Sequence, residues 1–297
     1  MPPPARGTWH AAAVSRIAII GGGNIGEALL SGLLRSGRQV NDIAVAERVP
    51  SRMRYLSETY PVLVTNVADA VKSADFVIVA VKPSDVDSVT DEIADAVARD
   101  KADSVEHVFV TVVAGVSTAY FEAKLPAGAP VVRVMPNAPM VVGAGVSAIA
   151  KGRFATQEEL NEVSAVFDSV GGVLTVPESQ LDAVTAVSGS GPAYFFLMVE
   201  ALVDAGVAAG LSRPVATDLV VQTMAGSAAM LLERVEEGGV AADVDTTPAR
   251  LRATVTSPAG TTAAGLAELE RGGLRAAVIA AVAAAKSRAG QLGITSE

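Results

Sequence analysis

Residues 16–26 read RIAIIGGGNIG, an aliphatic run followed at once by a glycine-rich turn. The run has the composition of a short buried strand, and residues 27–36 after the turn have helical spacing. The turn fits G-x-G-x-x-G at Gly21, Gly23 and Gly26. The first glycine permits a tight turn, the second lets a pyrophosphate approach the backbone, and the third lets helix and strand pack closely. The stretch therefore predicts the first strand and helix of a dinucleotide-binding α/β fold.

Outward from this turn, short β-branched runs alternate with helical patterns as far as about Val176. The runs are RIAII, DIAVA, VLVT, ADFVIVAV, HVFVTVV, PVVRVM and GVLTV. Parallel strands need crossover connections, so the alternation predicts a doubly wound α/β fold with a parallel sheet and helices on both faces. We expect this Rossmann-type domain over residues 15–176, after a flexible tail over residues 1–14.

Beyond Pro177 the strand pattern stops. Helical spacing runs over residues 181–202 and 214–235, and a polar stretch over residues 236–247 predicts a loop. These helices are rich in Ala and Gly and poor in aromatic residues, so a single copy has little with which to build a core. We expect residues 177–297 to form an all-helical domain that completes its core across a subunit interface.

Composition excludes several classes of function. The 297-residue chain is 50% hydrophobic and 19% charged, which excludes a mainly disordered protein. A net charge of -9 argues against a nucleic-acid partner. With no Cys and only His10 and His107, neither a disulfide nor a metal site is expected, and a reducing cytoplasm is the simplest compartment. No uninterrupted apolar run approaches the roughly 20 residues that cross a bilayer, so no membrane partner is expected.

The second predicted strand ends at Glu47, where a carboxylate would bind a ribose 2′-hydroxyl and oppose a 2′-phosphate. Arg48 and Arg52 follow, and they could bind such a phosphate or stack on adenine. The start of a solvated helix explains these two arginines equally well. The residues therefore leave the choice between NADH and NADPH open.

Two further strands end with residues suited to a ligand. The fourth ends in Ala80-Val81-Lys82-Pro83 and the next in Ala114-Gly115, at the carboxyl edge where ligands of open α/β sheets bind. Val81 would pack on a nicotinamide ring, and Lys82 would reach a ribose or phosphate. The alternative for Lys82 is an ordinary surface lysine.

A second candidate site is LRATVTSPAGTTAAGLAELE, residues 251–270. Ser257, Gly260, Thr261 and Thr262 precede an apolar helical repeat, so backbone N–H groups and hydroxyls should face outward together. Such a group can hold a small carboxylate. Capping of the helix is the ordinary role of hydroxyls at such positions.

The charged residues of the helical half restrict the reaction. No Lys lies between Lys151 and Lys286 and no His follows His107, so the general base that β-hydroxyacid dehydrogenases use is missing there. Reduction of a carbon–nitrogen double bond needs a placed hydride donor, an anchored carboxylate and a hydrogen-bonding group near nitrogen, which hydroxyls supply. A β-hydroxyacid or short imino-acid dehydrogenase and a non-catalytic cofactor-binding module remain as alternatives.

From Arg16 to its C-terminus the chain resembles the pyrroline-5-carboxylate reductases. The motifs that carry the resemblance are VTSPAGTTAAGLAELE (255–270), LDAVTAVSGSGPAY (181–194), RVMPNAP (133–139) and AVKP (80–83). The resemblance implies a cytoplasmic enzyme that reduces the small molecule 1-pyrroline-5-carboxylate to L-proline with NADPH, or with NADH as the alternative. It also implies homodimers whose helical domains interlock and often a decamer of five dimers, with substrate held between the nicotinamide and the helical-domain loop.

The same resemblance assigns roles to individual residues. Thr262 would be the catalytic residue whose hydroxyl bonds the imine nitrogen. Substrate-binding roles fall to Val255, Ser257, Gly260 and Thr261, and cofactor-binding roles to Asn24 and Ile25 at the pyrophosphate and to Asn66 near the adenosine. The chain departs from the family at Thr254, where Asn is frequent, and at Glu47-Arg48, where many members have small residues.

Overall fold

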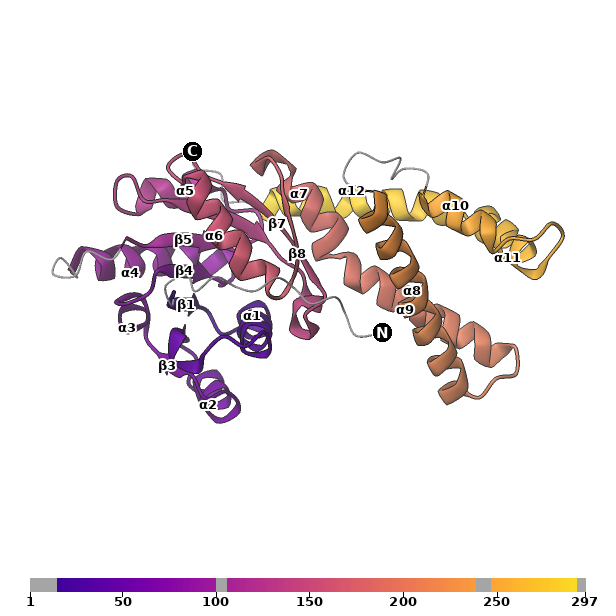
Figure 1. The fold of residues 1–297 in the computed structure, drawn as a ribbon, viewed down its shortest axis with the longest axis horizontal. Coiled ribbons are helices and arrows are strands. Elements are labelled where there is room, and N and C mark those ends of the chain that lie inside the picture. Colours follow the sequence, from indigo (N-terminus) through magenta and orange to yellow (C-terminus); the bar gives the residue numbers. More distant parts are fainter. Residues whose placement is uncertain (1–14, 100–105, 239–246, 293–297) are drawn as a thin grey trace. The chain divides into compact units, whose positions relative to one another are not determined.

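The computed structural model describes residues 15–99, 106–238 and 247–292. The chain divides into two compact units (Figure 1): one ends at Ser190 and takes up the chain again from Ala285, and Gly191–Ala284 form the other. The predicted tail over residues 1–14 lies outside the described residues, as does most of the predicted loop over residues 236–247.

A single sheet carries the first unit. Its strands among the described residues are β1 (Ile17–Ile20), β2 (Ile43–Ala46), β3 (Leu63–Thr65), β4 (Phe76–Val79), β5 (Val108–Thr111), β6 (Val131–Met135), β7 (Gly145–Lys151) and β8 (Gly171–Thr175). Their order is β3-β2-β1-β4-β5-β6-β7-β8. The first six strands pair in parallel, in the order typical of dinucleotide-binding folds, which confirms the predicted doubly wound α/β fold.

One strand was not predicted. β7 runs antiparallel to β6 and parallel to β8, so the sheet is mixed rather than wholly parallel. Its sequence, GVSAIAK, has only two bulky β-branched residues, Val146 and Ile149, among small ones, so it gives little strand signal. Ser147 and Ala148 are buried nevertheless, because neighbouring elements cover the middle of the strand.

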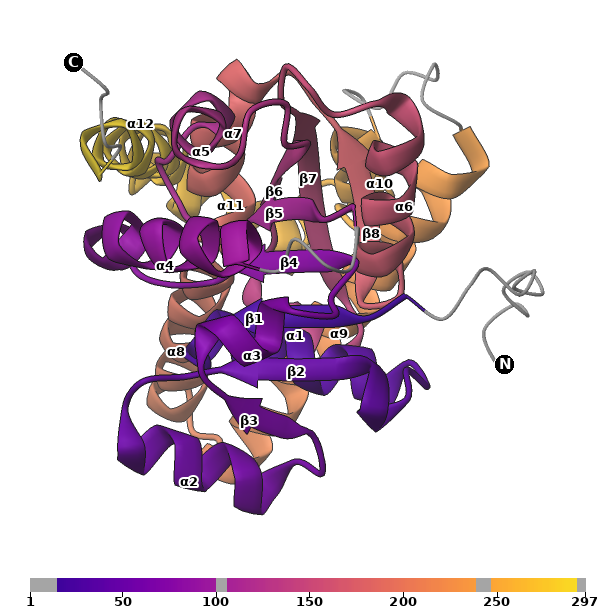
Figure 2. The same ribbon diagram turned by 90° about the vertical axis from the view of Figure 1, so that its left-hand side faces the viewer.

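Helices cover both faces of the sheet (Figure 2). On one face α1 (Asn24–Arg35), α2 (Pro50–Thr59) and α6 (Gln157–Asp168) pack on a core that includes Ile17 and Ile19. On the other face α3 (Val67–Val71), α4 (Val86–Arg99) and α5 (Thr118–Lys124) pack on a core that includes Ala18 and Ile20. Alternate residues of β1 thus enter opposite cores, as the period of a strand buried on both faces requires.

Short 3-10 turns complete this unit: η1 (Val40–Asp42), η2 (Pro83–Asp85), η3 (Ala138–Val142) and η4 (Glu178–Gln180). The strand order reverses between β1 and β4, so their carboxyl ends and that of β2 open together on one edge of the sheet. This reversal is the usual place for a ligand in an open α/β sheet.

The predicted boundary after Val176 corresponds to the end of the sheet, whereas the compact unit continues to Ser190. After β8 the chain forms η4, α7 (Leu181–Val184) and a π-helical turn, Thr185–Gly189. Leu181 is fully buried against residues of β7, which ties this segment to the sheet. The single helix predicted over residues 181–202 is therefore divided by the π turn.

Glu178 joins this connecting segment to the sheet unit. Its carboxylate accepts hydrogen bonds from the Thr118 backbone N–H at 2.7 Å and the Thr118 hydroxyl at 2.8 Å. The guanidinium of Arg133 on β6, whose side chain is 8% exposed, lies 3.3 Å from the same carboxylate and 3.6 Å from Asp182. The Glu178 carboxylate thus accepts the hydrogen bonds of Thr118 at the start of α5 and also pairs with the charge of the buried Arg133.

The second unit contains only helices among its described residues: α8 (Gly191–Ala208), α9 (Arg213–Gly238), α10 (Thr247–Thr254), α11 (Thr261–Arg271) and most of α12 (Leu274–Leu292). α8 and α9 pack on each other closely, because a Cβ on Gly206 would lie only 3.2 Å from that of Ala216. This confirms the predicted all-helical second half.

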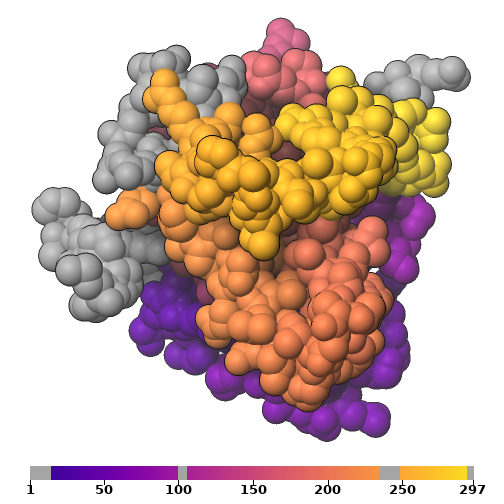
Figure 3. Space-filling model, turned by 90° about the vertical axis from the view of Figure 1, so that its right-hand side faces the viewer, coloured from indigo at the N-terminus to yellow at the C-terminus, as the bar shows by residue number. Residues whose placement is uncertain are grey.

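Large apolar side chains of this unit are exposed. Phe195, Phe196 and Leu197 on α8 are 60%, 67% and 66% exposed, and Ile279 on α12 is 70% exposed. Figure 3 shows a face formed largely by this unit, coloured salmon to yellow.

By length and composition alone, Glu178–Ala208 and Arg213–Glu233 among the described residues could each cross a membrane. An apolar surface of this extent is typical of an interface.

We predict that Glu178→Ala destabilises the protein by about 2 kcal/mol, because it leaves the Arg133 guanidinium and the Thr118 N–H without their main acceptor. Urea denaturation at fixed protein concentration measures this. Asp95→Ala is the matched control: it breaks a 3.4 Å ion pair with Arg99 whose side chains are 71% and 77% exposed, and it should cost less than about 1 kcal/mol. Equal losses in the two variants would contradict the role given to Glu178.

Candidate functional site

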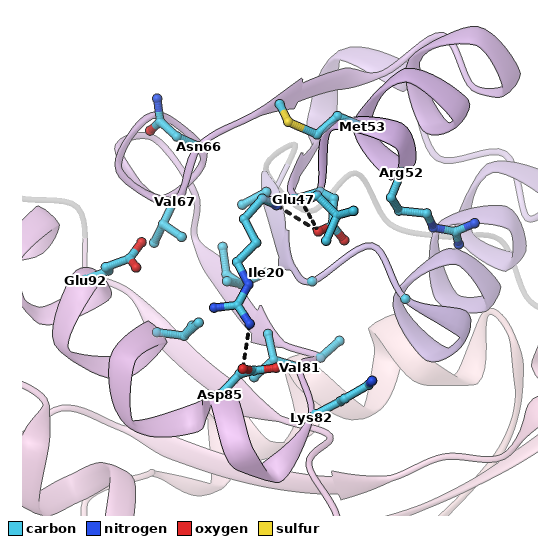
Figure 4. A pocket seen from close by; sticks show the side chains of 17 residues that line it. Ile20, Glu47, Arg52, Met53, Asn66, Val67, Val81, Lys82, Asp85 and Glu92 are labelled. Atoms are coloured by element: carbon cyan, nitrogen blue, oxygen red, sulfur yellow. Dashed lines mark hydrogen bonds and ion pairs between the residues drawn. The ribbon is translucent and has the colours of Figure 1, made fainter.

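A cavity of about 540 Å³ opens at the carboxyl ends of β1, β2, β3 and β4 (Figure 4). Its lining residues come from Ile20 to Glu92, all in the first unit. The structure brings together here the predicted cofactor-binding residues Gly21, Gly23, Arg48, Asn66, Ala80, Val81 and Lys82. These residues come from four separate strand ends, and the sheet topology alone makes them neighbours.

The glycine turn after β1 has two positions where the chain itself requires glycine. Gly21 has φ +108°, and a Cβ there would lie 2.6 Å from the Ala80 carbonyl oxygen at the end of β4. A Cβ on Gly26 would lie 1.9 Å from the Gly21 carbonyl oxygen. Both contacts are too short for any side chain, so these glycines permit the close packing of α1 on β1 and β4.

Gly23 is different, since nothing in the protein demands a glycine there. Its φ is −68°, and a Cβ at this position would meet no atom within 4 Å. Gly23 is also the N-cap of α1, and no side chain caps that helix. The first N–H groups of a helix without a cap are free to bind an anion. A bare backbone beside such a helix start fits a dinucleotide pyrophosphate.

Gly22, between these glycines, has both its backbone N–H and its carbonyl oxygen held by charged side chains. Its N–H donates to the Glu47 carboxylate at 3.0 Å, and its carbonyl oxygen accepts from the Arg52 Nε at 2.6 Å. Glu47 also accepts from the backbone N–H groups of Arg48 at 2.8 Å and Val49 at 2.9 Å. Glu47 therefore lies at the end of β2, as predicted, and in addition ties the glycine turn to the segment that begins α2.

Arg52 is oriented by Glu27, a residue that the sequence did not single out. Glu27 forms an ion pair with Arg52 and accepts hydrogen bonds from the hydroxyls of Tyr55 at 3.0 Å and Tyr60 at 2.9 Å. Burial raises the pKa of Glu27, but the hydrogen bonds from Arg52, Tyr60 and Tyr55 outweigh it and hold the pKa below the ordinary value of 4.5. The stability that this group contributes is present above pH 4.5 and is lost as the pH falls below it.

Arg48 extends to the opposite wall of the cavity. Its guanidinium lies 2.5 Å from the Asp85 carboxylate on η2, the dashed contact at Asp85 in Figure 4. Asp85 was not predicted as part of the site; its only sequence signal is its position three residues after Lys82. Asn66 lines the cavity and also caps α3, because its side-chain oxygen accepts from the Asp69 N–H at 2.9 Å.

The other predicted cofactor residues do not line the cavity. Asn24 and Ile25 begin α1, where their backbone N–H groups belong to the first helical turn. Pro83 begins η2 directly after Lys82. Ala114 and Gly115 follow β5, and Gly115 has φ +78°, which suits a turn that only glycine adopts easily. Their contacts with a cofactor stay a prediction.

The predicted substrate loop lies in the second unit, between α10 and α11. Gly260 is the N-cap of α11, no side chain caps that helix, and Thr261 and Thr262 are its first residues. Within the described part of the chain, the hydroxyls of Ser257 and Thr262 make no hydrogen bond to another residue. The capping role that we considered for these hydroxyls is therefore not what the structure has.

The backbone of this loop is unusual at one position. Ala259 has φ +56°, a left-handed conformation that costs a residue with a side chain about 1–2 kcal/mol. The turn is closed by a hydrogen bond from the Gly260 N–H to the Ser257 carbonyl at 3.0 Å. Val255 in the same loop is 58% exposed. The loop thus presents a helix N-terminus, free hydroxyls and an apolar side chain together, which suits a small carboxylate.

Gly23→Ala and Gly26→Ala form a matched pair that tests the glycine turn. In Gly23→Ala the added Cβ meets no protein atom, so the stability should change by less than about 1 kcal/mol. The affinity for NAD⁺ and NADP⁺ should fall at least about tenfold, because the methyl group occupies the pyrophosphate position. The second should lose about 1–3 kcal/mol of stability through the clash with Gly21. Thermal denaturation and calorimetric titration measure the two effects. Unchanged cofactor affinity in Gly23→Ala would contradict pyrophosphate binding at Gly23 and the start of α1.

Two family models match the chain. The model described as pyrroline-5-carboxylate reductase dimerisation matches residues 178–292. The model described as NADP oxidoreductase coenzyme F420-dependent matches residues 16–115, which hold the cavity.

Individual relatives match nearly the whole chain. The pyrroline-5-carboxylate reductase of Mycobacterium tuberculosis is 70% identical over 96% of this chain and 99% of its own length, and that of Mycobacterium leprae is 66% identical over the same shares. The solved structure of a pyrroline-5-carboxylate reductase from Coxiella burnetii is 34% identical with a TM-score of 0.80, covering 95% of this chain and 100% of that one. The Plasmodium falciparum pyrroline carboxylate reductase, solved with NADP bound, is 26% identical with a TM-score of 0.80, covering 94% and 98%. The identities and coverage confirm the resemblance seen in the motifs, and the chain belongs to the pyrroline-5-carboxylate reductase family.

Proposed function

We propose that this chain is a pyrroline-5-carboxylate reductase that transfers hydride from NADPH or NADH to the imine carbon of 1-pyrroline-5-carboxylate, giving L-proline in the last step of proline biosynthesis. The observation that carries this proposal is the 70% identity, over 96% of the chain, with the mycobacterial enzyme of that activity. The dinucleotide cavity and the hydroxyl-bearing loop are the two parts that such a reaction requires.

The first unit provides the cofactor site. Gly23 and the uncapped N-terminus of α1 hold the pyrophosphate, and Asn66 and the end of β2 lie on the adenosine side. Val81 and Lys82 after β4 lie on the nicotinamide side. When bound, the reduced nicotinamide supplies the hydride. The protein's part is to fix the position of the ring and to exclude water from it.

The α10–α11 loop provides the substrate groups. Ser257, Gly260 and Thr261 bind the carboxylate, with help from the positive end of the α11 dipole. The Thr262 hydroxyl hydrogen-bonds the imine nitrogen and assists its protonation. A protonated imine is already electrophilic, so this chemistry fits a helical half that has no Lys between Lys151 and Lys286.

The second unit makes the protein an oligomer. We propose a homodimer in which the exposed apolar side chains of α8, α9 and α12 pack against those of a second copy, and an assembly of five such dimers into a decamer. The dimerisation model over residues 178–292 and the exposure of Phe195, Phe196 and Ile279 support the dimer. We propose the cytoplasm as its compartment, in keeping with the absence of Cys.

We predict that Thr262→Val lowers kcat about 100-fold, because it removes the hydroxyl at the imine nitrogen while keeping the shape of the side chain. The dissociation constants for NAD⁺ and NADP⁺ should stay within about twofold of wild type. Thr254→Val is the matched control, since the Thr254 hydroxyl already donates to the Leu251 carbonyl at 2.7 Å and should matter little. Steady-state rates on the cyclic imine measure the effect. A Thr262→Val enzyme with full turnover would rule out the proposed role of the Thr262 hydroxyl.

We predict that the protein in solution is never a monomer at micromolar concentration, and that its mass by light scattering corresponds to ten chains. Phe196→Asp should reduce this mass, because a carboxylate would have to be buried without a partner at the interface. A monomeric wild-type protein would contradict the dimer. A stable species of another size would contradict only the decamer.

A further inference from the structure

The end of β2 gathers opposite charges at the place where the adenosine ribose lies in this fold. Glu47 and Arg48 follow β2 directly, and Asp85 reaches the same cavity from η2. NADH presents a hydroxyl at the ribose 2′ position and NADPH a phosphate. The distribution of these charges therefore bears on which of the two cofactors the protein prefers.

Glu47 favours a hydroxyl at this position. An ionised carboxylate has about four acceptor sites, and the backbone N–H groups of Gly22, Arg48 and Val49 occupy three of them. One site is left for a donor such as a ribose 2′-hydroxyl. A 2′-phosphate has no proton to donate at neutral pH and carries negative charge, so it is repelled.

Arg52 is not available to offset this repulsion. Its Nε donates to the Gly22 carbonyl oxygen at 2.6 Å, and another nitrogen forms an ion pair with Glu27. Its guanidinium also lies over the ring of Tyr55, 4.8 Å from the ring centroid. In Figure 4 its side chain leads away from Asp85 and Val81. Moving Arg52 to a phosphate would release the glycine turn that holds the pyrophosphate.

Arg48 is the cation best placed for a 2′-phosphate, and Asp85 competes for it. The two side chains form a 2.5 Å ion pair in which Arg48 is 66% exposed and Asp85 27% exposed. A pair this exposed is weak, so a phosphate can displace it, but the phosphate must then lie near both Asp85 and Glu47. The attraction of Arg48 is thereby largely cancelled.

We propose that Asp85 is a specificity-determining residue: it competes with the 2′-phosphate of NADPH for Arg48, so that NADH serves this enzyme at least as well as NADPH. The proposal rests on the proposed NAD(P)H-dependent reduction and specifies which cofactor that reaction uses. Asp85 affects binding of the 2′ substituent of the cofactor and does not affect binding of its pyrophosphate or nicotinamide.

The test compares the dissociation constants of NAD⁺ and NADP⁺, measured by calorimetric titration without substrate. Wild type should bind NADP⁺ no more tightly than NAD⁺. Asp85→Asn should tighten NADP⁺ about tenfold, the effect of one freed charge-assisted hydrogen bond, and leave NAD⁺ within about twofold. The double variant Arg48→Ala/Asp85→Asn should lose that gain, because the gain depends on the freed guanidinium.

Two single variants complete the design. Arg48→Ala alone should weaken NADP⁺ about tenfold and leave NAD⁺ within about twofold, because it leaves the Asp85 carboxylate without its counter-charge beside the 2′-phosphate. Asp91→Asn is the matched control: this carboxylate pairs with Lys124 at 3.1 Å, does not line the cavity, and should leave both constants unchanged. The proposal is overturned if Asp85→Asn leaves the ratio of the two constants at its wild-type value, or if the double variant Arg48→Ala/Asp85→Asn keeps the tighter NADP⁺ binding of Asp85→Asn.

Turnover separates this proposal from the proposed function. If the constants change as stated but no variant reduces the cyclic imine with either cofactor, the specificity role of Asp85 stands and the reductase assignment fails. If the imine is reduced with a kcat/KM for NADPH at least about tenfold above that for NADH, the reductase assignment stands and the specificity proposal fails.

Discussion

The close approach of three backbone segments at the glycine turn is the constraint on which the rest of the cofactor unit depends. Gly26 lets α1 begin against the Gly21 carbonyl, and Gly21 lets the turn lie against the Ala80 carbonyl at the end of β4. Because β1 and β4 are neighbours where the strand order reverses, this contact fixes the N-terminus of α1 over the open edge of the sheet. The cavity, the uncapped start of α1 beside it and the positions of Val81 and Lys82 all follow from it.

Charged side chains hold this turn in place, and the same side chains line the cavity at the end of β2. Glu47 accepts from the Gly22 N–H, Arg52 donates to the Gly22 carbonyl oxygen, and Glu27 orients Arg52. A change that replaces Glu47 or Arg52 would therefore also loosen the glycine turn. Asp85 and Arg48 have no such second role, since their side chains bind each other. Among the charges at this end of the cavity, this pair can vary at the lowest structural cost.

The helical unit depends on a different constraint, the burial of apolar surface. α8 and α9 pack closely through small residues such as Gly206, yet Phe195, Phe196 and Leu197 stay exposed. Among the described residues two segments have the length and hydropathy of membrane helices: Arg213–Glu233 in this unit, and Glu178–Ala208, which begins in the first unit. An interface with a second copy removes the same surface from water, and exposure of this extent in one chain gives such an assembly a strong driving force. In the α10–α11 loop, in contrast, the hydroxyls of Ser257 and Thr262 and the N-terminus of α11 have no side-chain hydrogen-bond partner among the described residues.

Local patterns in the sequence determined most of the fold and the kind of chemistry. The strand–turn–helix at residues 16–36, the alternation that follows, and the hydroxyl-rich loop before α11 are encoded by neighbouring residues, and a sequence read alone reveals them. β7 was missed because its small residues become a strand only when adjoining strands and helices cover them. The partners of the charged residues were missed for a related reason: Arg52 and Glu27 are 25 positions apart, and Arg48 and Asp85 are 37. Only the order of strands in the sheet brings such residues together, so the tertiary structure decided which charges at the cofactor site are paired and which are left for a ligand.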